Sequence, residues 1–151
     1  METMLSANGI VAGYRNRPVL HTVSVSVRQG EGVLVIGPNG CGKTTLLKVL
    51  AGVLRPERGQ VFLGDADVTS VLGDKRARMG LGYLMQTRNT FPSLTVAENL
   101  DLSFWHHDRN YTDRLDFVLT VFPMLKPMLD RRAGLLSGGE RQALAIGMVL
   151  M

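Results

Sequence analysis

Residues 33–45 read VLVIGPNGCGKTT, and this stretch decides the fold. The apolar run Val33–Ile36 is typical of a strand buried on both faces, as in a parallel sheet. After the glycine-rich loop, the pattern from Lys43 to Leu50 predicts a helix that ends near Gly52. A Gly-x-x-x-x-Gly-Lys-Thr string between a strand and a helix is typical of a loop that binds phosphate.

Each residue type in this loop has a chemical reason to be there. Glycines let the backbone amides turn inward, and the helix that follows points the positive end of its dipole at the same anion. We expect Lys43 to bridge the β- and γ-phosphates of a nucleotide and the Thr44 hydroxyl to ligate Mg²⁺. The residues expected to bind the nucleotide are Asn39, Gly40, Cys41, Gly42, Lys43, Thr44 and Thr45. A glycine-rich turn without a ligand is the structural alternative.

Cys41 is the single cysteine of the chain, so an internal disulfide is excluded, and it lies inside this loop. A thiol close to Lys43 and to a helix N-terminus is expected to be more acidic than usual. One hypothesis is therefore that modification of this thiol blocks nucleotide binding. The alternative is that a small side chain is what fits a tight loop.

The composition is that of an ordinary globular protein. Of the 151 residues, 45% are apolar and 20% are charged, so collagen-like and wholly disordered chains are excluded. A net charge of +4 does not by itself argue for nucleic acid. The longest apolar stretch, residues 143–151, is far shorter than the roughly 20 residues of a membrane helix. That stretch reaches the last residue without a helix cap, so we expect the chain to stop early.

The remaining pattern has a strand-rich first half and a helical second half. Runs of apolar residues predict strands, which we place at 5–11, 19–27, 60–63 and 81–86. Thr95 and Glu98 form a capping box, which predicts a helix that starts there. Further helices are expected at 113–122 and from about Ser137.

The string LSGGERQ at 136–142 carries the second chemical signal. Ser137 and Glu140 form a capping box at the start of an apolar helix. Gly138 and Gly139 leave the amides of the first turn uncovered, which creates an anion site at a helix N-terminus. Taken alone, the string favours a structural cap. In a chain that also carries the phosphate-binding loop, it favours a ligand.

Together, the two strings resemble those of the nucleotide-binding domain of ATP-binding cassette (ABC) proteins, and the resemblance runs from Leu5 to Met151. It implies an α/β P-loop NTPase fold with an antiparallel β subdomain and a helical subdomain, and ATP and Mg²⁺ as cofactors. It divides the chain into a nucleotide-binding core at 1–86, a helical subdomain at 87–136, and the signature motif with the start of its helix at 137–151.

The resemblance also implies roles outside the phosphate-binding loop. Tyr14 matches the aromatic residue that stacks on adenine, and such stacking is worth about 1–3 kcal/mol. Gln86 matches the Q-loop glutamine, which touches Mg²⁺ and the attacking water. In the family, Ser137, Gly138 and Gly139 contact the γ-phosphate held by the opposite subunit. A second ABC ATPase subunit is therefore implied as a partner, with two ATP molecules sandwiched head to tail.

A narrower resemblance points to importers. The string FPSLTVAENL at 91–100 is similar to the shorter ATPase subunit of branched-chain amino-acid importers and of related urea or amide importers. It implies membrane-spanning permease subunits as partners, a cytoplasmic location on the inner face of the cell membrane, and no nucleic acid. Met85 departs from the pattern, because a proline usually precedes the glutamine.

The chemistry implied for this family needs residues that the chain does not contain. Lys43 and Gln86 would be the catalytic residues, and Thr44 and Gln86 the Mg²⁺ ligands. Family members continue past the signature helix to a strand that ends in Asp-Glu, and then to a switch histidine. The chain has no Asp-Glu pair, and its three histidines precede the signature helix. We therefore expect the C-terminal part of the core to be missing and ATP hydrolysis by these 151 residues to be negligible.

Two other functions stay open from the sequence. One is a non-hydrolysing nucleotide-binding fragment that occupies a transporter without turnover. The other is a non-transport ABC ATPase of DNA repair or translation, a class that usually carries large insertions or tandem cassettes. His106 and His107 suggest a metal site, although adjacent histidines without further ligands more often lie on a solvated helix face.

Overall fold

The computed structural model describes residues 2–15, 17–87, 89–104 and 110–151, and the chain divides into two compact units. The first unit ends at Leu81 and the second begins at Gly82. The adjacent histidines at 106 and 107 lie outside the described residues.

The first unit is built on an antiparallel sheet with the strand order β2-β1-β3-β4. Its strands are β1 (Thr3–Tyr14), β2 (Arg17–Arg28), β3 (Arg58–Leu63) and β4 (Ala66–Asp67). The sequence predictions for β1, β2 and β3 are confirmed, each with longer bounds. The two-residue strand β4 is too short to leave an alternating pattern, and it was not predicted.

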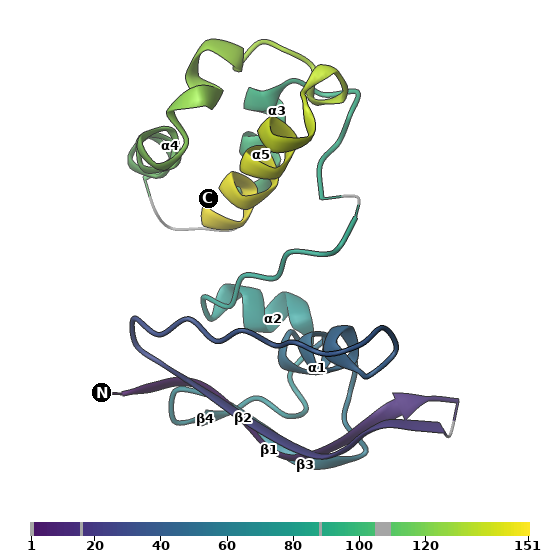
Figure 1. Cartoon of the computed structure of the whole chain (residues 1–151). Helices are drawn as coiled ribbons and strands as arrows, with labels where there is room; N and C mark the ends of the chain where they lie inside the picture. Colours follow the sequence, from purple (N-terminus) through teal and green to yellow (C-terminus); the bar gives the residue numbers. More distant parts are fainter. Residues whose placement is uncertain (1, 16, 88, 105–109) are drawn as a thin grey trace. The chain divides into compact units, whose positions relative to one another are not determined.

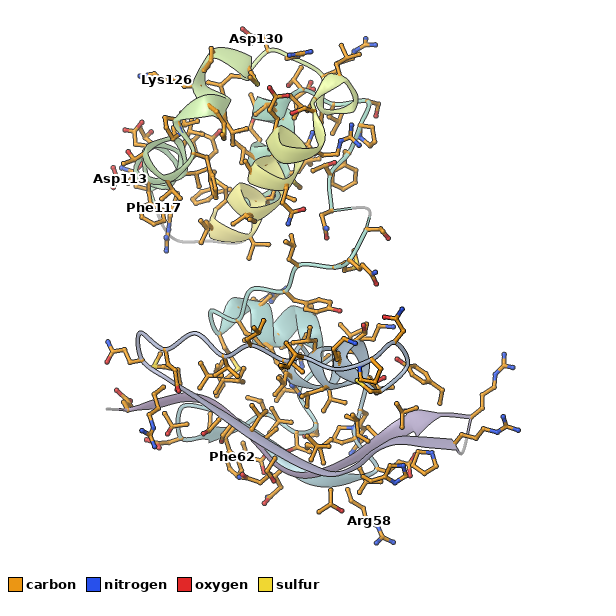
Figure 2. The ribbon with its side chains drawn as sticks, viewed as in Figure 1. Arg58, Phe62, Asp113, Phe117, Lys126 and Asp130 are labelled. Carbon is orange, nitrogen blue, oxygen red and sulfur yellow. The ribbon has the colours of Figure 1, made fainter. Side chains whose placement is uncertain are left out.

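One face of this sheet is covered by α1 (Lys43–Leu50) and α2 (Gly73–Arg78), as Figure 1 shows. The predicted helix from Lys43 is confirmed, whereas α2 is rich in charge and gave no helical pattern. The shared core consists of Ala7, Ile10, Ala12, Leu20, Leu46, Val49, Leu50, Val61 and Val68. Arg58 and Phe62 on β3 point away from the helices on the opposite face (Figure 2).

Two predicted strands are wrong. Residues 33–36 and 81–86 have no strand structure, and Leu34 and Ile36 are 83% and 79% exposed rather than buried on both faces. A strand is held by hydrogen bonds to a neighbouring strand, so apolar sequence alone does not make one. None of the described segments pairs with either stretch.

The second unit is helical. It contains α3 (Val96–Ser103), α4 (Tyr111–Val121), the 3₁₀ helices η1 (Pro123–Met128) and η2 (Ala133–Leu135), and α5 (Gly138–Leu150). The three predicted α-helices are confirmed, and Pro123 ends α4 as a proline ends a helical pattern. No helix in the described residues is both long enough and apolar enough to span a membrane.

A bulge in β2 holds one residue in an unfavourable backbone conformation. The pairs Ile10↔Val23 and Ala12↔Leu20 leave two β2 residues facing a single residue of β1. One of those two, Thr22, has φ of 57°, in the left-handed region that β-branched residues avoid. Thr22 is exposed, so no packing compensates for the strain.

We therefore expect Thr22→Gly to raise the free energy of unfolding by about 1 kcal/mol, because glycine adopts this conformation without a Cβ clash. Urea unfolding followed by circular dichroism measures the change. The matched control is Ser26→Gly, an exposed position of the same strand with ordinary φ, where glycine should destabilise the protein. Equal destabilisation by both substitutions would show that Thr22 is not strained.

Candidate functional site

The predicted phosphate-binding loop runs into the first turn of α1, and glycine is required where they join. Gly42 is the N-cap of α1 with φ of 101°. A Cβ built on Gly42 would lie 2.7 Å from Cδ2 of Leu20, a buried residue of β2. The backbone at the start of α1 is therefore pressed against the sheet, closer than any side chain at position 42 permits.

The N-terminus of α1 is left without a partner from its own helix. Gly42 offers no side-chain cap, and the first turn contains no acidic residue. Thr44 is exposed in that turn, while Thr45 is buried against the core. The positive end of the helix dipole and its free amides therefore face the loop without a compensating negative charge from α1.

Lys43 is folded back onto its own loop. Its Nζ donates hydrogen bonds of 2.8 Å to the carbonyl oxygens of Gly37 and Pro38, and it lies 3.8 Å from Sγ of Cys41. The two carbonyls are neutral, so they solvate the charge of Lys43 with their dipoles and do not cancel it as a carboxylate would. The exposed Cys41 thiol is therefore a neighbour of the Lys43 ammonium.

Tyr14 lies at the end of β1 and is 45% exposed. Lys48 of α1 approaches it: the Nζ is 3.4 Å from the Tyr14 hydroxyl and 5.6 Å from the ring centroid. The ammonium therefore lies nearer to the hydroxyl than to the face of the ring. The structure therefore brings Tyr14 into contact with α1, within the unit that also contains the loop.

Gln86 and the signature string belong to the second unit. Gln86 is exposed in a turn that Asn89 closes: Asn89 Oδ1 accepts from the Met85 amide at 2.9 Å, and Asn89 Nδ2 donates to the Met85 carbonyl at 2.6 Å. Sequence reasoning missed Asn89, whose only signal is the preference of asparagine for hydrogen bonds to nearby backbone.

Ser137 is the N-cap of α5 and forms the predicted capping box. Glu140 Oε2 accepts from the Ser137 amide at 2.7 Å, and the Ser137 hydroxyl accepts from the Glu140 amide at 3.4 Å. A Cβ on Gly138 or Gly139 would meet no atom within 4 Å. Packing within the chain therefore does not require glycine at these two exposed positions.

The loop that precedes the signature is tied to the segment that follows Gln86. Residues 92–97 run antiparallel to residues 129–134, with backbone hydrogen bonds such as Ala133 N to Leu94 O at 2.8 Å. The buried Asn99 of α3 braces the first of these segments. The Asn99 side-chain Oδ1 accepts a hydrogen bond from the backbone amide of Phe91. Its Nδ2 donates to the backbone carbonyls of Phe91, Leu94 and Thr95. Sequence reasoning missed Asn99 as well.

No group of three or more histidine, cysteine, aspartate or glutamate side chains in the described residues is placed to hold a metal ion. The Mg²⁺ ligands expected from the sequence, Thr44 and Gln86, lie in different units.

Comparisons with known proteins identify the fold. Residues 20–151 match the family model described as ABC transporter. The chain is 41% identical over 149 residues to the probable branched-chain amino acid transport ATP-binding protein LivF of Archaeoglobus fulgidus, covering 98% of this chain and 63% of that protein. It is 37% identical over 155 residues to the lipopolysaccharide export system ATP-binding protein LptB of Acidithiobacillus ferridurans, covering 99% of this chain and 63% of that protein.

Among solved structures, an ATP-binding cassette of an ABC transporter superposes with a TM-score of 0.86 at 31% identity, over 99% of this chain and 65% of that one. The expected P-loop NTPase fold of the ABC type is thereby confirmed. The chain spans slightly less than two thirds of the length of each of these proteins.

The capping boxes predict how the helices respond to acid. Hydrogen bonds from the backbone and side chain of Thr95 lower the pKa of Glu98, and those of Ser137 lower the pKa of Glu140. A carboxyl group whose pKa is lowered by folding stabilises the folded state at pH values above its ordinary pKa, which is near 4.5. This stability is lost as the pH falls through the pKa of the folded state.

We therefore expect the double variant Glu98→Gln/Glu140→Gln to lose less stability than the unaltered chain when the pH falls from about 6 to about 3, because glutamine keeps a capping oxygen but does not titrate. Urea unfolding at each pH gives the measurement. Glu57→Gln, an exposed carboxylate outside both boxes, is the control. If the double variant and the unaltered chain lose equal stability, the boxes do not set the acid response.

Proposed function

The chain belongs to the ABC transporter family, and on that premise we propose that it is the ATP-binding part of an ATP-hydrolysing transporter subunit, with the loop at 37–45 as the nucleotide site. The observation that carries the proposal is the start of α1, where free amides, the helix dipole and Lys43 meet without a negative charge from the helix. An anion with several oxygens, such as a triphosphate, is the ligand that this arrangement suits.

Phosphate binding would exchange the present partners of Lys43. Its Nζ would leave the carbonyls of Gly37 and Pro38 for phosphate oxygens, which carry more negative charge and form stronger hydrogen bonds. The amides from Asn39 to Thr45 would then surround the β-phosphate. Tyr14, which is nearly half exposed, would stack on the adenine.

The exposed Thr44 hydroxyl fits Mg²⁺, which prefers oxygen ligands and is commonly shared with substrate phosphates. When bound, the ion would neutralise charge that develops on the transferred phosphoryl group. We propose Thr44 and Gln86 as the ligands from this chain, and Lys43 and Gln86 as its catalytic residues.

The signature helix supports a partner across the nucleotide. Ser137, Gly138 and Gly139 present a hydroxyl and uncrowded amides that the chain itself does not use for packing. We propose that they contact the γ-phosphate bound by a second ABC ATPase subunit, so that two chains enclose two nucleotides head to tail.

An importer for branched-chain amino acids or a related small amide is the transport function that the sequence favours. The support is the string at 91–100 and the similarity to LivF. The similarity to LptB, named for lipopolysaccharide export, is nearly as high, so the transported substrate is the finer part of the proposal. Permease subunits would hold the protein at the inner face of the cell membrane.

A non-hydrolysing role for these 151 residues is a second candidate, because the chain contains no Asp-Glu pair to complete Mg²⁺ binding and orient water. ATP binding with negligible turnover favours this candidate, and steady turnover excludes it. The non-transport ABC ATPase considered from the sequence has no comparable observation in its favour.

Lys43→Ala should weaken the binding of a fluorescent ATP analogue, in the presence of Mg²⁺, by at least about tenfold, because a charge-assisted contact to phosphate is lost. The change in fluorescence on titration measures the affinity. Lys75→Ala removes the same charge from the exposed surface of α2 and should leave binding unchanged. If neither the unaltered chain nor the two variants bind the analogue, the proposed function is wrong.

Alkylation of Cys41 with N-ethylmaleimide should abolish ATP binding, because the adduct would fill the loop beside Lys43 Nζ. Bound ATP should protect the thiol from the reagent, and mass spectrometry measures that protection. Cys41→Ala should bind ATP with or without the reagent. Alkylated protein that binds ATP as well as untreated protein would contradict the hypothesis and favour a small residue that only fits the loop.

A further inference from the structure

Arg76 is the most deeply buried charged residue among those described, with 1% of its surface exposed. It lies on α2, where a run of charged residues gave no sign in the sequence of an internal role. Arginine is almost never fully buried unless its charge and its donors have partners. The partners of Arg76 therefore indicate what it does.

All five N–H donors of the guanidinium point at backbone carbonyls. Nη1 donates to Val49 and Leu50 at 2.8 and 2.6 Å, and Nη2 donates to Val68 and Thr69 at 2.6 and 3.4 Å. Nε donates to Val71 at 3.0 Å. One side chain therefore joins the end of α1 to the segment that connects β4 with α2, and every donor is used.

Val49 and Leu50 are the last two residues of α1, the helix whose first residue is Lys43. Carbonyls at the end of a helix lack partners within it and form the negative end of its dipole. A cation with N–H donors placed there supplies hydrogen-bond partners for the carbonyls and a positive charge opposite the negative end of the dipole. The two ends of α1 thus have different partners: Arg76 holds the C-terminal end, and the phosphate-binding loop precedes the N-terminal end.

Two glycines make this contact possible. A Cβ on Gly52, which has φ of 73°, would lie 2.8 Å from Nε of Arg76. A Cβ on Gly73, the first residue of α2, would lie 2.9 Å from the carbonyl oxygen of Ala51. The backbones that meet around the guanidinium approach more closely than side chains allow.

A helix of eight residues is about 12 Å long and moves as a rigid rod. Its N-terminal end is pressed on Leu20 through Gly42, and its C-terminal end is held by Arg76. A tilt at one end would move the amides at the other, and displacements of about 1 Å at a binding site can cost a hundredfold in function.

We propose that Arg76 is a positioning residue for the nucleotide site: by holding the C-terminal end of α1, it sets where the amides of the first turn and Lys43 meet the phosphates. The inference rests on the proposed nucleotide binding at 37–45. It assigns Arg76 no contact with the ligand, because its donors are fully used by carbonyls.

The test compares three variants of the full chain in binding a fluorescent ATP analogue with Mg²⁺. Arg76→Lys keeps the charge but offers three donors from a single nitrogen in place of five. We expect it to retain the sheet and helices by circular dichroism and to bind the analogue about tenfold more weakly. Ile10→Ala, which removes apolar atoms from the same core and leaves every hydrogen-bonding group around Arg76 unaltered, should change binding by less than about twofold.

Arg76→Ala gives a readout that a loss of stability alone does not move. It leaves a space lined by five carbonyls, and millimolar guanidinium should restore binding there while leaving Ile10→Ala unaffected. The inference is overturned if Arg76→Lys binds like the unaltered chain, if Ile10→Ala loses as much affinity as Arg76→Lys, or if guanidinium fails to rescue a folded Arg76→Ala. Absence of binding by the unaltered chain overturns the proposed function together with the inference.

Discussion

Buried backbone carbonyls and amides must find hydrogen-bond partners, and that requirement organises both units of this protein. In the first unit Arg76 donates hydrogen bonds to five backbone carbonyls, two at the end of α1 and three in the segment between β4 and α2. In the second unit Asn99, fully buried, bonds the backbone of the segment that follows Gln86. No buried side-chain nitrogen or oxygen in the described residues is left without a partner. Arg76 thereby holds the helix whose first residue is Lys43, and Asn99 holds the segment that follows Gln86.

The helix N-termini show how the same requirement separates structure from function. Helices α3 and α5 provide hydrogen-bond partners for their N-terminal amides from their own residues, through capping boxes in which a glutamate neutralises part of the dipole. Helix α1 has neither a side-chain cap nor an acidic residue in its first turn. Its capping is left to the loop and to whatever anion the loop holds. Among the described α-helices, the one that is least well capped by its own residues is therefore the one best suited to bind phosphate.

The signature helix differs from α1 in a way that bears on its role. Glu140 already supplies a negative charge at the start of α5, so a phosphate there would be held chiefly by Ser137 and by the open amides of the two glycines. Such a surface suits a contact completed by a second subunit rather than an independent site. The loop before it is joined by backbone hydrogen bonds to the segment after Gln86, which gives the two candidate elements of the second unit a common support.

The sequence by itself determined the helix that begins at Lys43 and both capping boxes, because each depends on residues close together in the chain. It also predicted the candidate phosphate-binding loop and three of the strands, although β1 and β3 pair across a long stretch of sequence. It also carried the family resemblance. Only the tertiary structure decided which apolar runs pair: residues 33–36 and 81–86 have strand-like sequences but no neighbour among the described strands. It alone revealed Arg76 and Asn99, because a polar side chain is buried or exposed according to carbonyls and amides that other segments supply, and sequence spacing does not encode their positions.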